Sequence, residues 1–297
     1  MNKIRMGLYL LIGVFILAGC GLVPNSYPPY VNITSNQLPK IKKVLLVGPN
    51  FEHFKGKLSS EEEAKLRQIW QNKLITTYNK KAADAKIRYI FVHKPEADQQ
   101  LVELESQMKL PSKYDEKTGK ISELYIQTYK KDMQNIVAQL AKDYSVDGVL
   151  RLSFVVLHPP LQMGGREVCW DGICVNPSEI NLKTFCLGLF LASGNAVPDV
   201  NYSGRMPVVS LSLKLYDRQG NLLLKGRAGY QVLKQLDFIT NSGVKTLKLE
   251  KVFSPSASWW NKQYSRACIN IAVNILLDPQ KYAQKSSEYQ KEMKTWQ

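Results

Sequence analysis

The stretch Val209-Ser210-Leu211-Ser212-Leu213-Lys214-Leu215-Tyr216-Asp217 alternates apolar residues with mostly polar ones. A period of two residues is typical of a β-strand with one buried face and one wetter face. The turn residues Arg218-Gln219-Gly220-Asn221 follow, and residues 222–233 are again rich in apolar side chains. We therefore expect a long antiparallel hairpin here.

Strand and helix patterns alternate before and after this hairpin. Strands are expected at residues 41–47, 87–92 and 149–157, and amphipathic helices at residues 60–78, 121–144 and 256–277. Ser60 with Glu63 fits a capping box at the start of the first helix. The predicted class is α/β (an α+β sandwich): a mixed β-sheet with two to three packed amphipathic helices and an insertion that carries a disulfide.

Three segments resemble parts of a known domain. They are Lys43-Val44-Leu45-Leu46-Val47, Tyr144-Ser145-Val146-Asp147-Gly148-Val149-Leu150, and the stretch from Ser210 to Asp217 with its Gly-Asn turn and closing helix. Their order is similar to the α/β domain shared by the TolB amino-terminal region and the curli-secretion lipoprotein group. This resemblance spans most of residues 40–279 and implies one domain with that strand and helix order.

The first twenty residues predict export. Lys3 and Arg5 form a short basic start, residues 6–17 are apolar, and Leu17-Ala18-Gly19-Cys20 places small residues before a cysteine. This order is typical of a secretory signal. The ending resembles the lipobox of bacterial lipoproteins, which implies cleavage before Cys20 and acyl chains such as palmitate on that residue.

A transmembrane anchor is the competing interpretation of this segment. Residues 6–23 lack charge and are about long enough to cross a bilayer. Gly13, Gly19 and Gly21 weaken such a helix and Pro24 ends it, so we expect lipidation, which is sufficient for stable attachment. Gly21 also lacks the aspartate that resembles an inner-membrane retention signal. We expect the outer membrane of a bacterial envelope, with the domain in the periplasm.

Composition divides the chain into four parts. Residues 1–19 are the expected signal peptide, and residues 20–39, with four prolines, read as an extended lipidated tether. Residues 40–279 form the single α/β domain. Glycines, prolines and cysteines in residues 161–205 break its pattern and indicate an insertion. Residues 280–297 are expected to be a charged tail that forms a loosely held helix.

Cysteine positions predict one disulfide. Five cysteines are present, of which lipidation uses Cys20. Cys169 and Cys174 flank an Asp-Gly pair, the preferred two-residue hairpin turn. That turn places the two cysteines in a non-hydrogen-bonded pair whose α-carbons are close enough for a disulfide. An exported protein permits this bond.

The other cysteines and Trp170 leave alternatives open. Cys186 and Cys268 either pair with each other or remain buried thiols. A metal site competes with the disulfide, but no histidine lies near the pair. The closed loop would hold Trp170 in shape, so Trp170 is the residue expected to contact a partner. The insertion is expected to bind that partner and to be dispensable for folding.

Enzyme signatures are missing from the sequence. The three histidines, His53, His93 and His158, share no metal-binding spacing. There is no nucleophile elbow and no phosphate-binding glycine loop. We therefore expect no catalytic residue, no metal and no cofactor.

The charge suggests acidic or membrane partners. The net charge is +15, and removal of Lys3 and Arg5 leaves +13. Export argues against nucleic acid, so anionic lipids, acidic glycans or acidic proteins are the expected counter-charges. The expected function is that of a non-enzymatic envelope lipoprotein that assists assembly or secretion through contacts with envelope proteins. The alternative is a binding module for an acidic envelope glycan or lipid.

Overall fold

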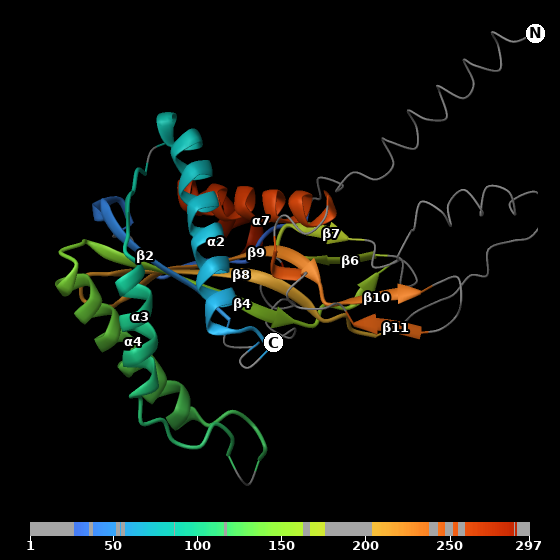
Figure 1. The fold of residues 1–297 in the computed structure, drawn as a ribbon, viewed down its shortest axis with the longest axis horizontal. Coiled ribbons are helices and arrows are strands. Elements are labelled where there is room, and N and C mark those ends of the chain that lie inside the picture. Colours follow the sequence, from blue (N-terminus) through green and yellow to red (C-terminus); the bar gives the residue numbers. More distant parts are fainter. Residues whose placement is uncertain are drawn as a thin grey trace, which may run out of the picture.

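A mixed six-stranded sheet is the centre of the fold (Figure 1). The structure, a computed structural model, describes residues 27–289 except 36–37, 52–53, 55–56, 86, 116–117, 163–166, 176–203, 238–242, 247–251, 255–258 and 288. The strand order is β1-β9-β8-β4-β2-β3. The strands are β1 (Val31–Ile33), β2 (Lys43–Asn50), β3 (Ile90–His93), β4 (Gly148–Leu157), β8 (Val208–Asp217) and β9 (Leu222–Val232). The predicted hairpin is confirmed as β8 and β9.

Strand direction divides this sheet into two parts. β2 is parallel to both β3 and β4, whereas β4, β8, β9 and β1 pair with antiparallel neighbours. The helices are α2 (Ser60–Lys81), α3 (Pro95–Ser106), α4 (Glu123–Asp143), α7 (Trp259–Leu277) and α8 (Pro279–Ser287), with short 3-10 turns η1 (Leu38–Lys40) and η3 (Ala82–Asp84). The predicted mixed α/β class is confirmed.

Two small sheets complete the described elements. One contains β5 (Leu161–Gln162), β6 (Glu167–Trp170) and β7 (Ile173–Val175), and the other contains β10 (Lys234–Asp237) and β11 (Gly243–Thr246). The predicted helix at 256–277 is observed from Trp259. In residues 95–120, where the polar sequence with Pro111 and Gly119 predicts a loop or a short helix, the structure has the helix α3.

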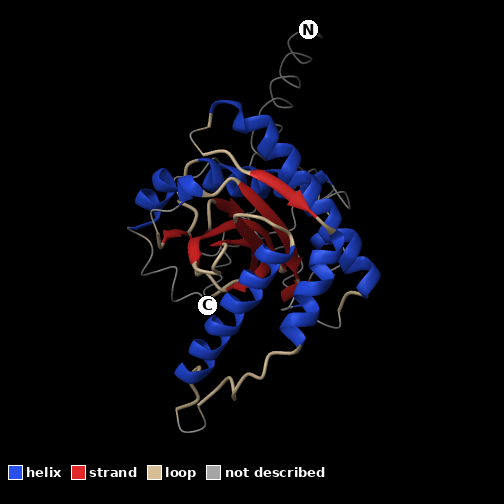
Figure 2. Cartoon of the chain, turned by 90° about the vertical axis from the view of Figure 1, so that its left-hand side faces the viewer, coloured by secondary structure: helices blue, strands red, loops and turns tan. Residues whose placement is uncertain are grey.

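Each face of the six-stranded sheet is apolar and is covered by a different set of helices. Leu211, Leu213 and Leu215 of β8 belong to the largest core cluster, which α2 and α7 cover with Trp70 and Ile269 among others. The opposite face packs against α3 and α4. Figures 1 and 2 show the sheet between these two helical layers. The domain is thus a layered α/β structure with a core on each side of the sheet.

The start of α2 differs from the prediction by one residue. Ser59, not Ser60, is the N-cap, and its side chain accepts a hydrogen bond from the backbone N–H of Glu62. The Glu62 carboxylate in turn accepts from the Ser59 backbone N–H. The sequence Ser-Ser-Glu-Glu-Glu contains both frames of the capping box, so the pattern fixes the motif but not its register.

The predicted tether is wrong for its second half. Tyr30, Val31 and Leu38 are buried, and β1 pairs with β9 as the edge strand of the sheet. The sheet accepts this Pro-rich segment because the outer edge of β9 offers unpaired backbone groups. Only residues between Cys20 and Tyr27 remain as a candidate link, and they lie outside the described residues.

The predicted tail is also partly wrong. α8 packs on β1, where the Ser286 hydroxyl donates to the Val31 carbonyl at 2.8 Å and accepts from the Val31 N–H at 3.3 Å. Tyr27 contacts the ring of Tyr289 with 5.2 Å between centroids. The two ends of the described chain therefore lie together, beside α7 and α8.

Candidate interaction surfaces

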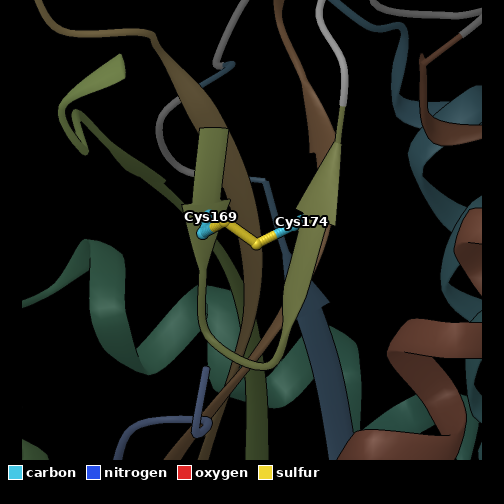
Figure 3. Close-up of a disulfide and its surroundings, with 2 residues drawn as sticks. All are labelled: Cys169 and Cys174. Atoms are coloured by element: carbon cyan, nitrogen blue, oxygen red, sulfur yellow. A yellow bond between two sulfur atoms is a disulfide. The ribbon is translucent and has the colours of Figure 1, made fainter. Parts of the chain in front are cut away.

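The hairpin of β6 and β7 has the predicted turn and disulfide. Cys169 pairs with Cys174, and their sulfurs form a disulfide (Figure 3). Asp171 and Gly172 both have positive φ, 39° and 92°, as a type I′ turn requires. The prediction from the Asp-Gly pair is confirmed.

Trp170 is not available to a partner. Its side chain has no exposed surface, and its indole Nε1 donates to the Val209 carbonyl at 3.2 Å. It belongs to a core cluster with Leu157 and Val208. The expectation that Trp170 contacts a partner is therefore wrong, because packing against the sheet covers the whole indole.

The turn of this hairpin approaches β9 closely. Gly229 donates its N–H to the Asp171 carbonyl at 2.8 Å. A Cβ at Gly229 would lie 2.6 Å from Ile173 Cγ1 and 2.8 Å from the Trp170 carbonyl oxygen. A side chain at this position would separate the two elements. Residues 167–175 are thus part of the core, which corrects the idea of a wholly dispensable insertion; residues 163–166 and 176–203 lie outside the described residues.

A buried ion pair fastens the same turn. Asp171 Oδ2 lies 3.1 Å from Arg227 Nε, and the side chains are 0% and 2% exposed. The Ser210 hydroxyl donates to Asp171 Oδ2 at 2.7 Å, and the Arg227 guanidinium lies 4.4 Å from the centre of the Tyr30 ring. The sequence indicated Asp171 only as a turn residue. Nothing in its local pattern signals a partner on β9.

The other predicted cysteines have separate outcomes. Cys268 is a buried thiol without a disulfide, and burial raises its pKa well above the usual thiol value. Cys186 and the lipidation candidate Cys20 both lie outside the described residues. For Cys268, the structure matches the buried-thiol alternative.

The carboxyl ends of the parallel strands are the place where α/β sheets most often bind ligands, because chain connections there leave toward opposite faces. Asp98 of α3 lies at this edge and accepts hydrogen bonds from the Gly48 N–H at 2.6 Å and the Gln71 amide at 3.0 Å. Burial raises the Asp98 pKa, and these two hydrogen bonds act in the opposite direction. The Asp98 carboxylate thus ties α3 to β2 and α2.

A second buried charge strengthens this edge. Arg151 of β4 forms an ion pair with Glu105 of α3, with 2.5 Å between Arg151 Nη2 and Glu105 Oε1. The Asn50 amide donates to Glu105 Oε2 at 3.1 Å. Removal of either partner would leave the other charge without a counter-charge and largely shielded from water. The pair is therefore needed for the stability of the fold. These groups hold α3 against the sheet, and each of the four contacts of Asp98 and Glu105 goes to another element of the domain.

Histidines and acidic groups do not gather into a metal site in the part of the chain that the structure describes. His93 ends β3 and His158 follows β4, while His53 lies outside the described residues. Within the same described part, no helix combines the length and apolar character needed to cross a membrane.

The two helical layers differ in charge. α2, α7 and α8 carry nine Lys or Arg and three Asp or Glu, whereas α3 and α4 carry three Lys or Arg and seven Asp or Glu. All three acids of the first group lie in the first turn of α2, where the helix dipole favours them. The remainder of the α2–α7 layer is basic, a polarity that the overall net charge did not reveal.

Cations meet where α2 crosses α7. Lys73 of α2 donates to the Ser265 hydroxyl at 3.4 Å, and Lys81 donates to the Asn274 side-chain oxygen at 3.2 Å. Burial lowers the Lys73 pKa, and the nearby charges of Lys262 and Arg266 on α7 lower it further. Like charges are therefore held close together on this face.

The opposite layer ends in an apolar tip. Four of the five large hydrophobic residues that are most exposed in the described chain lie on α3, on α4 or in the loop between them: Val102, Tyr114, Ile121 and Leu124, at 46%, 54%, 51% and 62%. An antiparallel bridge joins Tyr114 to Ile121. This connection projects from the sheet at the bottom of both views (Figures 1 and 2). We call these four residues the α3–α4 tip.

Comparisons with known proteins give no match: no family model, no curated protein and no solved structure is significantly similar to the chain.

Proposed function

We propose that this chain is a non-enzymatic lipoprotein of the bacterial cell envelope that assists an assembly or secretion machine through protein contacts. Cys20 would carry the acyl chains, with the domain in the periplasm and the outer membrane as the destination. The lipobox-like Leu17-Ala18-Gly19-Cys20 supports the anchor. The resemblance of the strand and helix order to the TolB amino-terminal and curli-secretion lipoprotein domains supports a role in the envelope.

The observation that carries the proposed contact is the α3–α4 tip. Single exposed apolar residues are ordinary, whereas a group on one projecting element is typical of an interaction site. The tip contributes nothing to the sheet core, because Leu101 and Met133 of the same helices already face it. Exposed Glu96 and Glu103 lie on the same helix as Val102. The loop between α3 and α4 adds the exposed cations Lys109, Lys113 and Lys120. The partner surface should therefore be mainly apolar, with polar groups of both signs around it.

The polar interior is consistent with a binding role. Asp98, Arg151 and Asp171 each bind another element of the fold, as described above, and so act in stability. Because these buried charged groups serve the fold, we assign the function to the surface. The α3–α4 tip provides exposed apolar area for a contact with a partner protein.

Site-specific photocrosslinking in intact envelopes tests the proposal. A photoreactive residue at Ile121 or Leu124 should capture a defined set of envelope proteins, whereas one at exposed Thr76 on α2 should not capture that set. With the photoreactive residue placed at the neighbouring Tyr114, Ile121→Asp combined with Leu124→Asp should abolish the capture and leave the circular dichroism spectrum unchanged, with Thr76→Asp as the matched control. Equal capture from Thr76, or none from the tip, would contradict the assigned contact surface.

The anchor has its own test. The wild-type protein should incorporate a labelled fatty acid and float with vesicles even in high salt, and Cys20→Ser should lose the label. Label retained by the variant would refute attachment at Cys20. Fractionation with the inner membrane would refute the proposed destination.

A further inference from the structure

We infer that the outer face of α2 and α7 lies against anionic phospholipid headgroups of the membrane that holds Cys20. This inference deepens the proposed function, since it rests on the proposed lipid anchor. It assigns the basic helical layer to the membrane and leaves the opposite layer, with the α3–α4 tip, for protein partners.

The charge pattern of the two helices carries the first part of the argument. No Asp or Glu occurs from Ala64 to Lys81 or from Trp259 to Leu277. The exposed or half-exposed cations of these two helices are Lys65, Arg67, Lys73, Lys80, Lys81, Lys262 and Arg266, of which Arg67 pairs with Glu63 in the first turn of α2 and the others lie beyond it. Exposed helix faces commonly alternate the sign of charge, which adds stability through pairs one turn apart. A helix face without acidic residues lacks the stabilisation from such pairs, and its positive charge attracts an anionic surface.

The cations are also brought together from two elements. Lys262 and Arg266 stand one turn apart on α7, so they share one side of that helix. Both act on Lys73 of α2, whose amine is held beside Ser265. Repulsion among these three charges weakens when phosphate groups lie opposite them. A lipid headgroup supplies such a phosphate.

The point where the chain enters the domain carries the second part. Tyr27, the first described residue, packs in the cluster that contains Tyr264, Ala267 and Ile271 of α7. Seven residue steps separate it from Cys20, and a fully extended chain covers at most about 25 Å over that length. An acylated Cys20 therefore holds Tyr27, and with it the core cluster against which Tyr264, Ala267 and Ile271 of α7 also pack, within about 25 Å of the bilayer surface.

Position and charge together favour lipid over the other anionic candidates. A soluble acidic protein or a glycan would also complement these cations, but neither is held next to α7 by the chain itself. The headgroup layer is already within reach, which acts as a high local concentration. Polybasic surfaces next to a lipid anchor supply the second signal that strengthens membrane attachment.

Lysine footprinting of the full-length lipidated protein in vesicles tests the inference. The protein is incorporated into phosphatidylcholine vesicles with or without phosphatidylglycerol, then treated with an acetylating reagent and analysed by mass spectrometry. Acetylation of Lys81 and Lys262 should fall several-fold in the anionic vesicles. Acetylation of Lys130 and Lys131, exposed on α4 in the opposite layer, should not change.

Salt and charge reversal complete the test. The protection should disappear at about 1 M salt, where the screening length falls to about 3 Å. Lys262→Glu with Arg266→Glu should remove the protection of Lys81, whereas Lys130→Glu with Lys131→Glu should leave it unchanged. Circular dichroism checks that both variants are folded. Equal acetylation of Lys81 and Lys262 in both kinds of vesicle would overturn the inference.

The outcomes separate the inference from the proposed function. Loss of vesicle flotation at high salt would refute the lipid anchor. Flotation at high salt without protection of the α2–α7 face would refute the membrane contact alone. Protection of this face in native envelopes but not in anionic vesicles would also overturn it, and would assign the face to an acidic partner.

Discussion

Asp171 and Arg227 form an ion pair that lies entirely inside the domain and joins the turn of a disulfide-closed hairpin to the β9 strand. The Oδ2–Nε distance is 3.1 Å, and neither side chain is more than 2% exposed. The two residues come from parts of the sequence with different apparent roles, a hairpin turn and a strand. The pair explains why a hairpin that resembles a surface loop is packed as core.

Arg227→Met should destabilise the domain strongly. The substitution leaves the Asp171 carboxylate buried without its counter-charge, which typically costs about 3–5 kcal/mol. Chemical denaturation should report this loss, and Arg218→Met in the exposed turn between β8 and β9 is the control. Adding Asp171→Asn to Arg227→Met should recover part of the stability. A loss below about 1 kcal/mol for the single variant would contradict the role of the pair.

Loss of the disulfide should be tolerated. Cys169 and Cys174 are separated by only 5 positions, so closing the loop contributes about 2 kcal/mol or less in the chain-entropy model. Cys169→Ser with Cys174→Ser should remain folded at room temperature, with a lower melting temperature. Peptide mapping without reduction should recover the two wild-type cysteines as one linked fragment. An unfolded double variant would show that the bond does more than close the loop.

Trp170 should matter for folding and residues 176–203 should not. Trp170→Ala removes a fully buried indole, and such truncations cost about 3–5 kcal/mol. Replacement of residues 161–205 by a glycine-serine loop should therefore unfold the domain. Replacement of residues 176–203 alone should preserve the fold. Thermal melting of the two replacements decides the matter, and equal stability would show that β6 and β7 are dispensable.

Cys268 should be inert in the native protein. Its thiol is buried and its pKa is raised, so the reactive thiolate is disfavoured. An alkylating reagent at neutral pH should modify Cys268 only after denaturation, as read by mass spectrometry. Rapid modification under native conditions would mean that α7 opens from the sheet.

Asp98 should make stability fall with rising pH in the acid range. Burial raises its folded-state pKa above that of a solvent-exposed aspartate, so the folded state retains the proton to higher pH than the unfolded state. The resulting stabilisation is present below the unfolded-state pKa and is lost as pH rises through the folded-state pKa. Asp98→Asn should lack this component when denaturation curves are compared across pH. Parallel pH curves for the two proteins would refute the shift.

Local pattern predicted the parts of the fold that depend on local chemistry. Alternation along Val209–Asp217 gave β8, and the Asp-Gly pair gave the turn of the disulfide hairpin. β1 was missed because its three residues follow two prolines, and only the edge of β9 makes them a strand. The contact between Asp171 and Arg227 was missed for a related reason. Pairing across 56 positions depends on how the sheet and the hairpin meet, and neither segment contains a sign of it.

The basic layer was missed in a different way. The composition gave the total charge, but only the structure assigns α2 and α7 to one face of the sheet and α3 and α4 to the other. The long stretch without Asp or Glu in α2, and the one in α7, can both be read from the sequence. Only the packing of α2 against α7 brings Lys73 close to Lys262 and Arg266 and makes these stretches one basic surface.

The β1 strand sets an order of events during synthesis. Val31 pairs with Gly226 and is held by Ser286, 255 positions later. A ribosome makes the amino-terminal strand first, and that strand cannot reach its final place until the last helix has been made. The edge of the sheet that is synthesised first is thus completed last.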